Sequence, residues 1–382
     1  MKKIFLLLAC LFYFSATIAE EVTTVNPTLD STIPTIAATS YVLQDFYSGQ
    51  ILLEKDADIQ VDPASLTKIM TAYIVFEKLH KNQIQLTDEV KISEKAWRSI
   101  GSRMYLEVAT QVSVDLLLKG MIIQSGNDAA IALAEHIAGS EEKFVVIMNE
   151  YAQKLGLTHT HYVNSTGFTI EGHYSTARDL GKIASILIRD FPEYYRLYSE
   201  KEFTYDKVSQ SNRNLLLWRD KSVDGLKTGY TEAAGYCLIA SAKRGGMRLI
   251  SVIMGAKSKT ARADESEKLL NYGFNAYETY QLYQAKETLN TDTVWQGATS
   301  TVKLGLADTL YVTVPKGKYS DVTANLYLDK QIIAPVKTGQ PCGTLRLNLA
   351  GKLLAEYPVV ALHDVEVGNV FQQTIDFIWR QF

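Results

Sequence analysis

The spacing of apolar residues changes near residue 285, and this change constrains the fold more than any other feature of the sequence. Before it, short alternating runs that suit β-strands are separated by longer segments with helical spacing. After it, only short alternating runs remain, with turn residues between them. Because 382 residues are enough for two domains, we expect a mixed α/β domain over 36–280 and a small β-sandwich over 287–362, joined by a linker near 280–288.

The strands of the first domain are expected to come from both of its ends. Residues 41–46 and 51–53 have the pattern of a β-hairpin, and so do residues 236–242 and 247–255. Helical spacing is found at 63–79, 114–125, 129–138, 141–155, 176–189 and 261–280. In the second domain the expected strands are 301–304, 309–314, 322–328, 331–336, 343–349 and 352–361. The first domain is therefore predicted to be an antiparallel sheet with helices packed on it.

Residues 1–19 have the layout of a secretory signal peptide. Lys2 and Lys3 precede an apolar run that is too short to span a bilayer, and small residues lead to Ala19 and an acidic pair. The segment around Cys10 also resembles a lipoprotein cleavage box, but the apolar run continues well past it, which favours ordinary cleavage after Ala19. We therefore expect the mature chain in the periplasm, outside the cytoplasm.

The last segment, 366–382, has the pattern of an amphipathic helix. Its apolar face contains Val367, Val370, Phe371, Ile375, Ile378, Trp379 and Phe382. A helix with Phe and Trp on its apolar face suits a membrane surface, so we expect peripheral attachment to the cytoplasmic membrane. A helix packed back onto the β-domain has the same pattern. Only Arg380 is positive here, so insertion of apolar side chains has to carry any membrane binding.

Charge and cysteine content exclude several classes of function. The formal net charge is −3, without the basic footprint that nucleic-acid binding requires. Cys237 and Cys342 are far apart in sequence and do not form a disulfide framework. We interpret both as buried thiols.

Ser65-Leu66-Thr67-Lys68 is the first of three elements that point to chemistry. Ser65 and Lys68 are three residues apart, so on a helix their side chains lie on one face. The start of a helix also favours a developing anion. A neutral lysine can take the serine proton, and apolar surroundings lower the pKa of Lys68. The pattern alone is weak, because Ser140 to Lys143 and Ser300 to Lys303 also match it.

The other two elements are Ser125-Gly126-Asn127 and Lys227-Thr228-Gly229. Ser125 and Asn127 lie where one apolar helix ends and an Ala-rich one begins, so they can face a cleft. Alternatively, Asn127 or Asp128 can simply cap the second helix. Lys227 and Thr228 on an edge strand can hold a carboxylate, while Gly229 leaves room for a peptide backbone. Lys337-Thr338-Gly339 repeats the tripeptide in the β-rich domain, where we interpret it as a turn.

The order Ser-x-x-Lys, Ser-x-Asn, Lys-Thr-Gly resembles that of the low-molecular-weight penicillin-binding proteins, specifically the serine-type D-alanyl-D-alanine carboxypeptidases. Stretches such as 62–71, 172–177 and 212–218 agree with this family. The resemblance implies a penicillin-binding/β-lactamase-like transpeptidase domain followed by a small all-β domain. It also implies removal of the terminal D-alanine from peptidoglycan pentapeptides, inhibition by β-lactams, and a part in cell-wall trimming and cell shape.

Specific roles follow from the resemblance. Ser65 is the acylated nucleophile, Lys68 is its base, and Ser125, Asn127 and Lys227 complete the catalytic set. Peptidoglycan stem peptides and β-lactams are the expected partners. The protein is expected to be a monomer or weak dimer, and the reaction needs no metal or cofactor.

Substrate binding is assigned to four further residues by the same resemblance. Thr228 and Arg248 bind the terminal carboxylate, Gly229 admits the backbone, and the N–H groups of Tyr230 and Ser65 form the oxyanion hole. Tyr230 departs from the family, since histidine often stands there.

The sequence departs from the family at further positions, and it also permits other functions. Leu215 stands where glycine is common, and His173 is interpreted as structural, before a helix capped by Thr176. A class A β-lactamase needs a glutamate to activate the deacylating water, and residues 157–167 contain no acid. Endopeptidase action on cross-links and a catalytically silent wall-binding protein stay open as alternatives.

Overall fold

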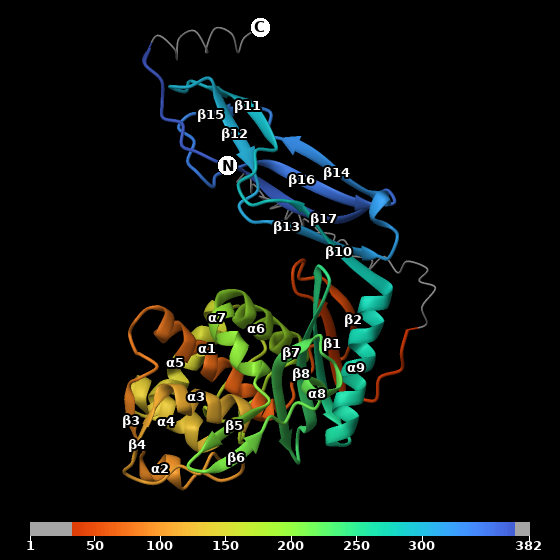
Figure 1. Cartoon of the computed structure of the whole chain (residues 1–382). Helices are drawn as coiled ribbons and strands as arrows, with labels where there is room; N and C mark the ends of the chain where they lie inside the picture. The colour runs from red at the N-terminus through yellow and green to blue at the C-terminus, as the bar shows by residue number, and fades with distance from the viewer. Residues whose placement is uncertain (1–32, 371–382) are drawn as a thin grey trace, which may run out of the picture.

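The computed structural model describes residues 33–370. They form two domains, stacked end to end in Figure 1. The predicted signal peptide (1–19) and most of the predicted C-terminal helix (366–382) lie outside the described residues. Within 33–370, no helix has both the length and the apolar character needed to cross a membrane.

The N-terminal domain is built on a five-stranded antiparallel sheet in the order β2-β1-β9-β8-β7. Its strands are β1 (Ser40–Asp45), β2 (Ile51–Lys55), β7 (Val223–Thr231), β8 (Gly235–Arg244) and β9 (Met247–Ala256). The two expected hairpins are confirmed, and β1 pairs with β9 to join the two ends of the domain. Strand β7 is an edge of this sheet.

Helices cover both faces of the sheet (Figure 1). They are α1 (Lys68–His80), α2 (Glu94–Trp97), α3 (Val114–Ile123), α4 (Asn127–Ala138), α5 (Glu141–Lys154), α6 (Ala177–Asp190), α7 (Pro192–Tyr195), α8 (Leu216–Arg219) and α9 (Lys259–Ala276). The larger core packs α1 and its neighbours on one face, and α9 closes the other. Helix ends are set by local sequence: the Ser113, Ser140, Thr176 and Ser258 side chains each accept the N–H of a residue in the first turn.

Short elements that the sequence pattern did not reveal frame the domain. They are η1 (Ala64–Thr67), η2 (Arg196–Ser199) and the two-stranded pairs β3 (Glu89–Lys91) with β4 (Gln111–Ser113) and β5 (Glu202–Tyr205) with β6 (Val208–Ser211). Strands of three or four residues carry too few alternations to be detected from sequence.

The C-terminal domain packs a six-stranded sheet, in the order β14-β16-β17-β12-β11-β15, against the pair β10-β13. Its elements are β10 (Tyr277–Tyr283), β11 (Asn290–Trp295), β12 (Thr301–Gly305), β13 (Leu310–Pro315), η3 (Tyr319–Asp321), β14 (Val322–Leu328), β15 (Ile332–Ile333), β16 (Pro341–Leu349) and β17 (Lys352–Ala361). The predicted all-β domain is confirmed.

The boundary between the domains lies earlier than we expected. The helix predicted to reach residue 280 ends at Ala276, and Tyr277–Tyr283 forms β10, which pairs with β13. The helical spacing continues into this segment, but its pairing with the distant strand β13 decides its structure. The expected linker near 280–288 is therefore largely part of the second domain.

Hydrogen bonds join the β1–β2 turn of the first domain to β10 and β13 of the second. The buried Asp45 carboxylate accepts from Ser48 at 2.7 Å and from Thr279 at 2.8 Å. Thr313 contacts both Ser48 at 2.7 Å and Thr279 at 3.0 Å. This polar cluster fixes the two domains to each other at one edge of the sheet.

Candidate active site

A cavity of about 1240 Å³ opens beside β7 and collects most of the residues singled out from the sequence. Its lining includes Ser65, Ser125, Asn127, Thr228, Gly229 and Tyr230. Lys68 and Lys227 lie directly beneath this lining and are almost fully buried. The three sequence elements therefore converge, although 162 residues separate Ser65 from Lys227 (227 − 65).

Ser65 sits in the 3₁₀ turn η1, and Lys68 is the first residue of α1. In a 3₁₀ turn, side chains three residues apart lie above one another, and Lys68 Nζ is 3.0 Å from Ser65 Oγ. The preceding Ala64 has a φ of 48°, in the left-handed region, and Asp62 accepts its N–H at 2.7 Å. A strained turn thus presents the serine at the helix start.

The Lys68 amine has two further partners, and both can only accept. It lies 2.7 Å from Asn127 Oδ1 and 2.6 Å from the Thr166 carbonyl. A neutral amine has two N–H donors and one lone pair. With the donors used on these two oxygens, the lone pair faces Ser65 Oγ, as a base requires.

Burial is the main reason that the pKa of Lys68 falls to about 7, and the Arg213 charge lowers it further. Asp128 and Glu141 act in the opposite direction. A substantial fraction of Lys68 is therefore neutral near neutral pH.

Ser125 and Asn127 lie in the break between α3 and α4. Ser125 has a φ of 68°, and Asn127 is the first residue of α4. The Asn127 side-chain amide donates to Ile100 O at 2.6 Å, and its oxygen accepts a hydrogen bond from Lys68 Nζ. Its orientation is thus fixed from both sides. The simpler interpretation as a helix cap is wrong, because Gly126 is the N-cap residue of α4 and no side chain caps this helix.

Asp128, which the sequence offered only as a possible cap of the second helix, holds the neighbouring wall of the cavity. Its buried carboxylate accepts the backbone N–H groups of Met104, Tyr105 and Leu106. Asn127 N–H in turn donates to Ser102 O at 2.7 Å. The segment that contributes Gly101 and Ser102 to the lining is therefore anchored to the start of α4.

Lys227 projects from β7 towards Ser125. Its Nζ lies 2.8 Å from Ser125 Oγ and 3.0 Å from Thr228 O. Burial, and then the positive charges of Lys68, Arg213 and Arg262, lower the pKa of Lys227 well below its usual range. No carboxylate among the described residues is paired with either lysine of the site.

Strand β7 passes very close to the Ser65 turn at Gly229. A Cβ there would lie 3.1 Å from Ala64 Cβ and 3.3 Å from Ser65 N. Glycine at this position allows the close approach, because a side chain would crowd the Ser65 turn; its dihedral angles do not demand it. The next residue, Tyr230, is half exposed and packs on Tyr236, with ring centroids 4.3 Å apart.

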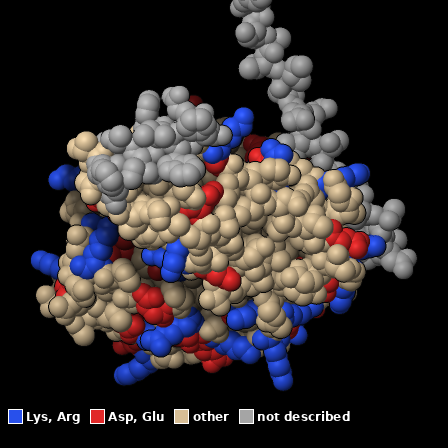
Figure 2. All heavy atoms as spheres, turned by 90° about the horizontal axis from the view of Figure 1, so that it is seen from above, with Lys and Arg blue, Asp and Glu red and all other residues tan. Residues whose placement is uncertain are grey.

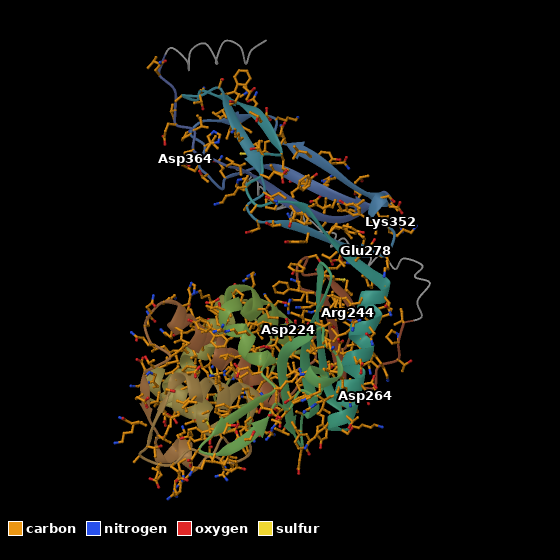
Figure 3. The ribbon with its side chains drawn as sticks, viewed as in Figure 1. Asp224, Arg244, Asp264, Glu278, Lys352 and Asp364 are labelled. Carbon is orange, nitrogen blue, oxygen red and sulfur yellow. The ribbon has the colours of Figure 1, made fainter. Side chains whose placement is uncertain are left out.

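Arg248 does not line the cavity. On β9 it forms a two-point ion pair with Asp224, at 2.8 and 2.7 Å, and also donates to Ser241 Oγ. Three hydrogen bonds thereby hold its guanidinium within the domain, and Figure 3 marks Asp224 near the side that faces the C-terminal domain. The expectation that Arg248 binds the substrate carboxylate does not fit this placement.

Two other arginines, which the sequence interpretation did not assign, do line the cavity: Arg213 and Arg262. Arg262 projects from α9 and donates to Gly229 O at 2.9 Å. Arg213 lies between Asn212, whose side-chain oxygen accepts the Asn214 N–H, and Asn214, whose side chain donates to Gly225 O of β7. The Asn-Arg-Asn triplet was the available signal, but only the fold shows that it reaches the cavity.

His173 is structural, as expected. Its ring is buried, its Nδ1 accepts from Val163 N–H at 3.0 Å, and its Nε2 lies 2.8 Å from Thr67 Oγ1. Nδ1 is thus the acceptor and Nε2 carries the proton. Burial is the main cause that lowers the pKa of His173 to about 4, which keeps the ring neutral. The helix that follows is capped by Thr176, as predicted.

The loop 164–168 presents a backbone carbonyl to Lys68 where a class A β-lactamase needs a glutamate. Glu171 is exposed and outside the lining, and Glu232 is the single carboxylate among the described lining residues. This arrangement agrees with the expectation that the site is not that of a β-lactamase.

Two family profiles match the chain. Residues 25–258 match a family described as D-alanyl-D-alanine carboxypeptidase. Residues 277–367 match the C-terminal domain of penicillin-binding protein 5, which agrees with the boundary before Tyr277.

Individual relatives agree with these matches. The chain is similar to the D-alanyl-D-alanine carboxypeptidase DacC of Escherichia coli, with 45% identity over 98% of this chain and 94% of the relative. It is also 43% identical to DacA of Haemophilus influenzae, over 97% of this chain and 96% of that protein. A crystal structure of penicillin-binding protein 5 from Haemophilus influenzae has a TM-score of 0.84 and 44% identity, and covers 88% of this chain and 99% of that one.

Proposed function

Because the chain belongs to the D-alanyl-D-alanine carboxypeptidase family, and is thus a serine-type carboxypeptidase of the penicillin-binding class, we propose that its reaction passes through an acyl-enzyme on Ser65. The observation that carries this proposal is the contact between Lys68 Nζ and Ser65 Oγ, with both other amine partners being acceptors. The base is thereby oriented before substrate arrives.

Acylation begins when Lys68 takes the Ser65 proton and Ser65 Oγ attacks the carbonyl carbon of the penultimate D-alanine. The backbone N–H groups of Ser65 and Tyr230 stabilise the oxyanion. The C–N bond then breaks, and the leaving amine gains the proton that Lys68 took from Ser65, relayed by the Ser125 hydroxyl, which Lys227 orients. Water completes the cycle: its hydroxyl goes to the acyl carbon and its proton to Ser65 Oγ.

Recognition of the terminal carboxylate is assigned to Thr228 and Arg213, with Arg262 bracing the strand. Arg213 lines the cavity and has no carboxylate partner among residues 33–370. Arg262 contributes positive charge but uses one guanidinium nitrogen on the Gly229 and Cys237 carbonyls. A carboxylate in the cavity therefore meets a cation that no internal acid neutralises.

Mass spectrometry of the mature protein tests the mechanism. Benzylpenicillin is expected to leave an adduct on Ser65, and a pentapeptide ending in D-alanyl-D-alanine is expected to lose D-alanine. Ser65→Ala should abolish both, whereas Ser300→Ala, in an exposed copy of the same Ser-x-x-Lys pattern, should change neither. An adduct that maps to another residue, or D-alanine release that survives Ser65→Ala, would contradict the proposal.

We also propose that the mature chain works in the periplasm at the membrane surface. The signal-like residues 1–19 and the amphipathic pattern of 366–382 support this placement. Deleting residues 368–382 should move the protein from the membrane fraction to the soluble one. Membrane association that persists after the deletion would contradict the role of the helix.

A further inference from the structure

The Thr166 carbonyl, one of the two acceptors that orient Lys68, belongs to a loop with no regular structure. Within the loop, Asn164 Oδ1 accepts the N–H groups of Thr166 at 3.1 Å, Gly167 at 2.7 Å and Phe168 at 3.2 Å. These bonds shape the turn but do not determine where it lies relative to α1. A separate contact has to fix the distance between Thr166 O and Lys68.

That contact is made through Ser165, which is fully buried. Its carbonyl accepts from Thr71 Oγ1 of α1 at 2.8 Å. Its N–H and its hydroxyl both donate to Glu141 Oε1, at 3.0 and 2.7 Å. The loop is thus held between α1, which contains Lys68, and the first residue of α5, which is Glu141.

Glu141 is itself held in place. Its side chain is buried, and its second oxygen, Oε2, pairs with Lys95 of α2 at 2.9 Å. Its position in the first turn of α5 favours a negative charge. The neighbouring Glu142 binds the same lysine but is exposed and, among the described residues, forms no hydrogen bond with the loop, so it lacks the contact to Ser165 that Glu141 makes.

We propose that Glu141 is a positioning residue for the nucleophile's base. Through Ser165 it holds the Thr166 carbonyl where that oxygen takes one N–H of neutral Lys68, so that the amine lone pair faces Ser65 Oγ. The inference deepens the proposed mechanism and rests on Lys68 acting as the base.

Glu141 also acts on Lys68 through its charge. The charged groups that face Lys68 are Arg213 and Lys227, which are positive, and Asp128 and Glu141, which are negative. Glu141 raises the pKa of Lys68 against the effect of burial. A neutral side chain at position 141 therefore lowers that pKa further and moves the acid limb of activity to lower pH.

The test measures acylation by a fluorescent penicillin from pH 5 to 9 in the full mature chain, at a temperature below the melting midpoint of every variant. Glu141→Ala should slow acylation roughly 10- to 100-fold, the effect of a small misplacement of a catalytic group. Glu142→Ala is the matched control and should acylate at the wild-type rate. Wild-type acylation by Glu141→Ala would overturn the proposal.

Two further variants separate positioning from simple loss of stability. Glu141→Gln keeps an acceptor for Ser165, so it should retain most of the plateau rate while its acid limb moves to lower pH. Ser165→Ala keeps the charge and one N–H bond, so it should lose part of the rate without a limb shift. Equal losses in Glu141→Gln and Glu141→Ala with an unmoved limb would reduce Glu141 to a packing role.

If wild-type chain does not acylate on Ser65 at all, the proposed function fails first. If the wild-type chain acylates on Ser65 and the Glu141 variants acylate at the same rate, the positioning role of Glu141 fails while the proposed function stands. The two failures are therefore distinguishable in one set of measurements.

Discussion

The tripeptide Lys-Thr-Gly occurs once in each domain, and the surroundings of the two copies are opposite. Lys227 is 2% exposed and contacts a hydroxyl and a carbonyl, with no acid as partner. The Lys337 side chain is 61% exposed and pairs with both Asp364 and Glu366. Thr338 also binds Asp364, and Gly339 has a φ of 84°, as expected for a turn.

A similar contrast separates the cations of the cavity from Arg346 in the C-terminal domain. Around the cavity, the buried Lys68 and Arg262 and the exposed Arg213 have no acid partner among the described residues, whereas in the C-terminal domain Arg346 pairs with Glu356 at 2.5 Å. Figure 2 shows positive and negative side chains interspersed on the face seen from above, and Figure 3 places Asp364 in the C-terminal domain, away from the first. A buried cation without an acid is costly, but it is also what lowers a lysine pKa and attracts an anion. The two copies of Lys-Thr-Gly therefore differ in whether the fold supplies a counter-ion for the lysine.

The sharpest test of this comparison exchanges alanine for each lysine of the two tripeptides. Lys227→Ala should lower kcat/KM for D-alanine release by roughly 10²–10⁴-fold, because a group that governs proton transfer is lost. Lys337→Ala, which removes only an exposed ion pair, should leave kcat/KM unchanged. A large loss from Lys337→Ala would break the comparison.

A smaller effect is expected for the arginines. Arg213→Ala removes a charged donor to the substrate carboxylate, and such hydrogen bonds contribute about 1.5–3 kcal/mol, so KM should rise roughly 10- to 100-fold with kcat less affected. Arg346→Ala serves as the control and should leave both constants unchanged. An unchanged KM in Arg213→Ala would assign carboxylate recognition to Thr228 and Arg262.

The smallest expected effect is the pH dependence near neutrality. Lys68 must be neutral to act as a base, and its pKa is about 7, so acylation should rise as pH increases through about 7 and be roughly tenfold below its plateau at pH 6. The pKa of Lys337 is instead raised, mainly by its hydrogen bond to Glu366. Titration of Lys337 therefore does not contribute to the pH dependence of acylation between pH 5 and 8. A flat acylation rate from pH 5 to 8 would show that Lys68 is not the base.

Much of the fold and site could be predicted, because the relevant signals are local. Alternation predicted the hairpins of β1–β2 and β8–β9, and Ser65 with Lys68 are close because three residues along a helical turn place them so. The early boundary before Tyr277 and the ion pair of Arg248 with Asp224 could not be predicted, since each depends on a partner distant in sequence.

The sequence by itself determined the order of the longer elements, the three motifs and the interpretation of the second Lys-Thr-Gly as a turn, since all of these follow from residue type and spacing. Only the tertiary structure decided which arginines enter the cavity and that Glu141 reaches Ser165. Hydrogen bonds and ion pairs act over about 3 Å, and the positions of Lys227, Ser125 and Glu141 to that precision are set by packing of the whole domain. The spacing of residues along the chain does not determine these distances between side chains.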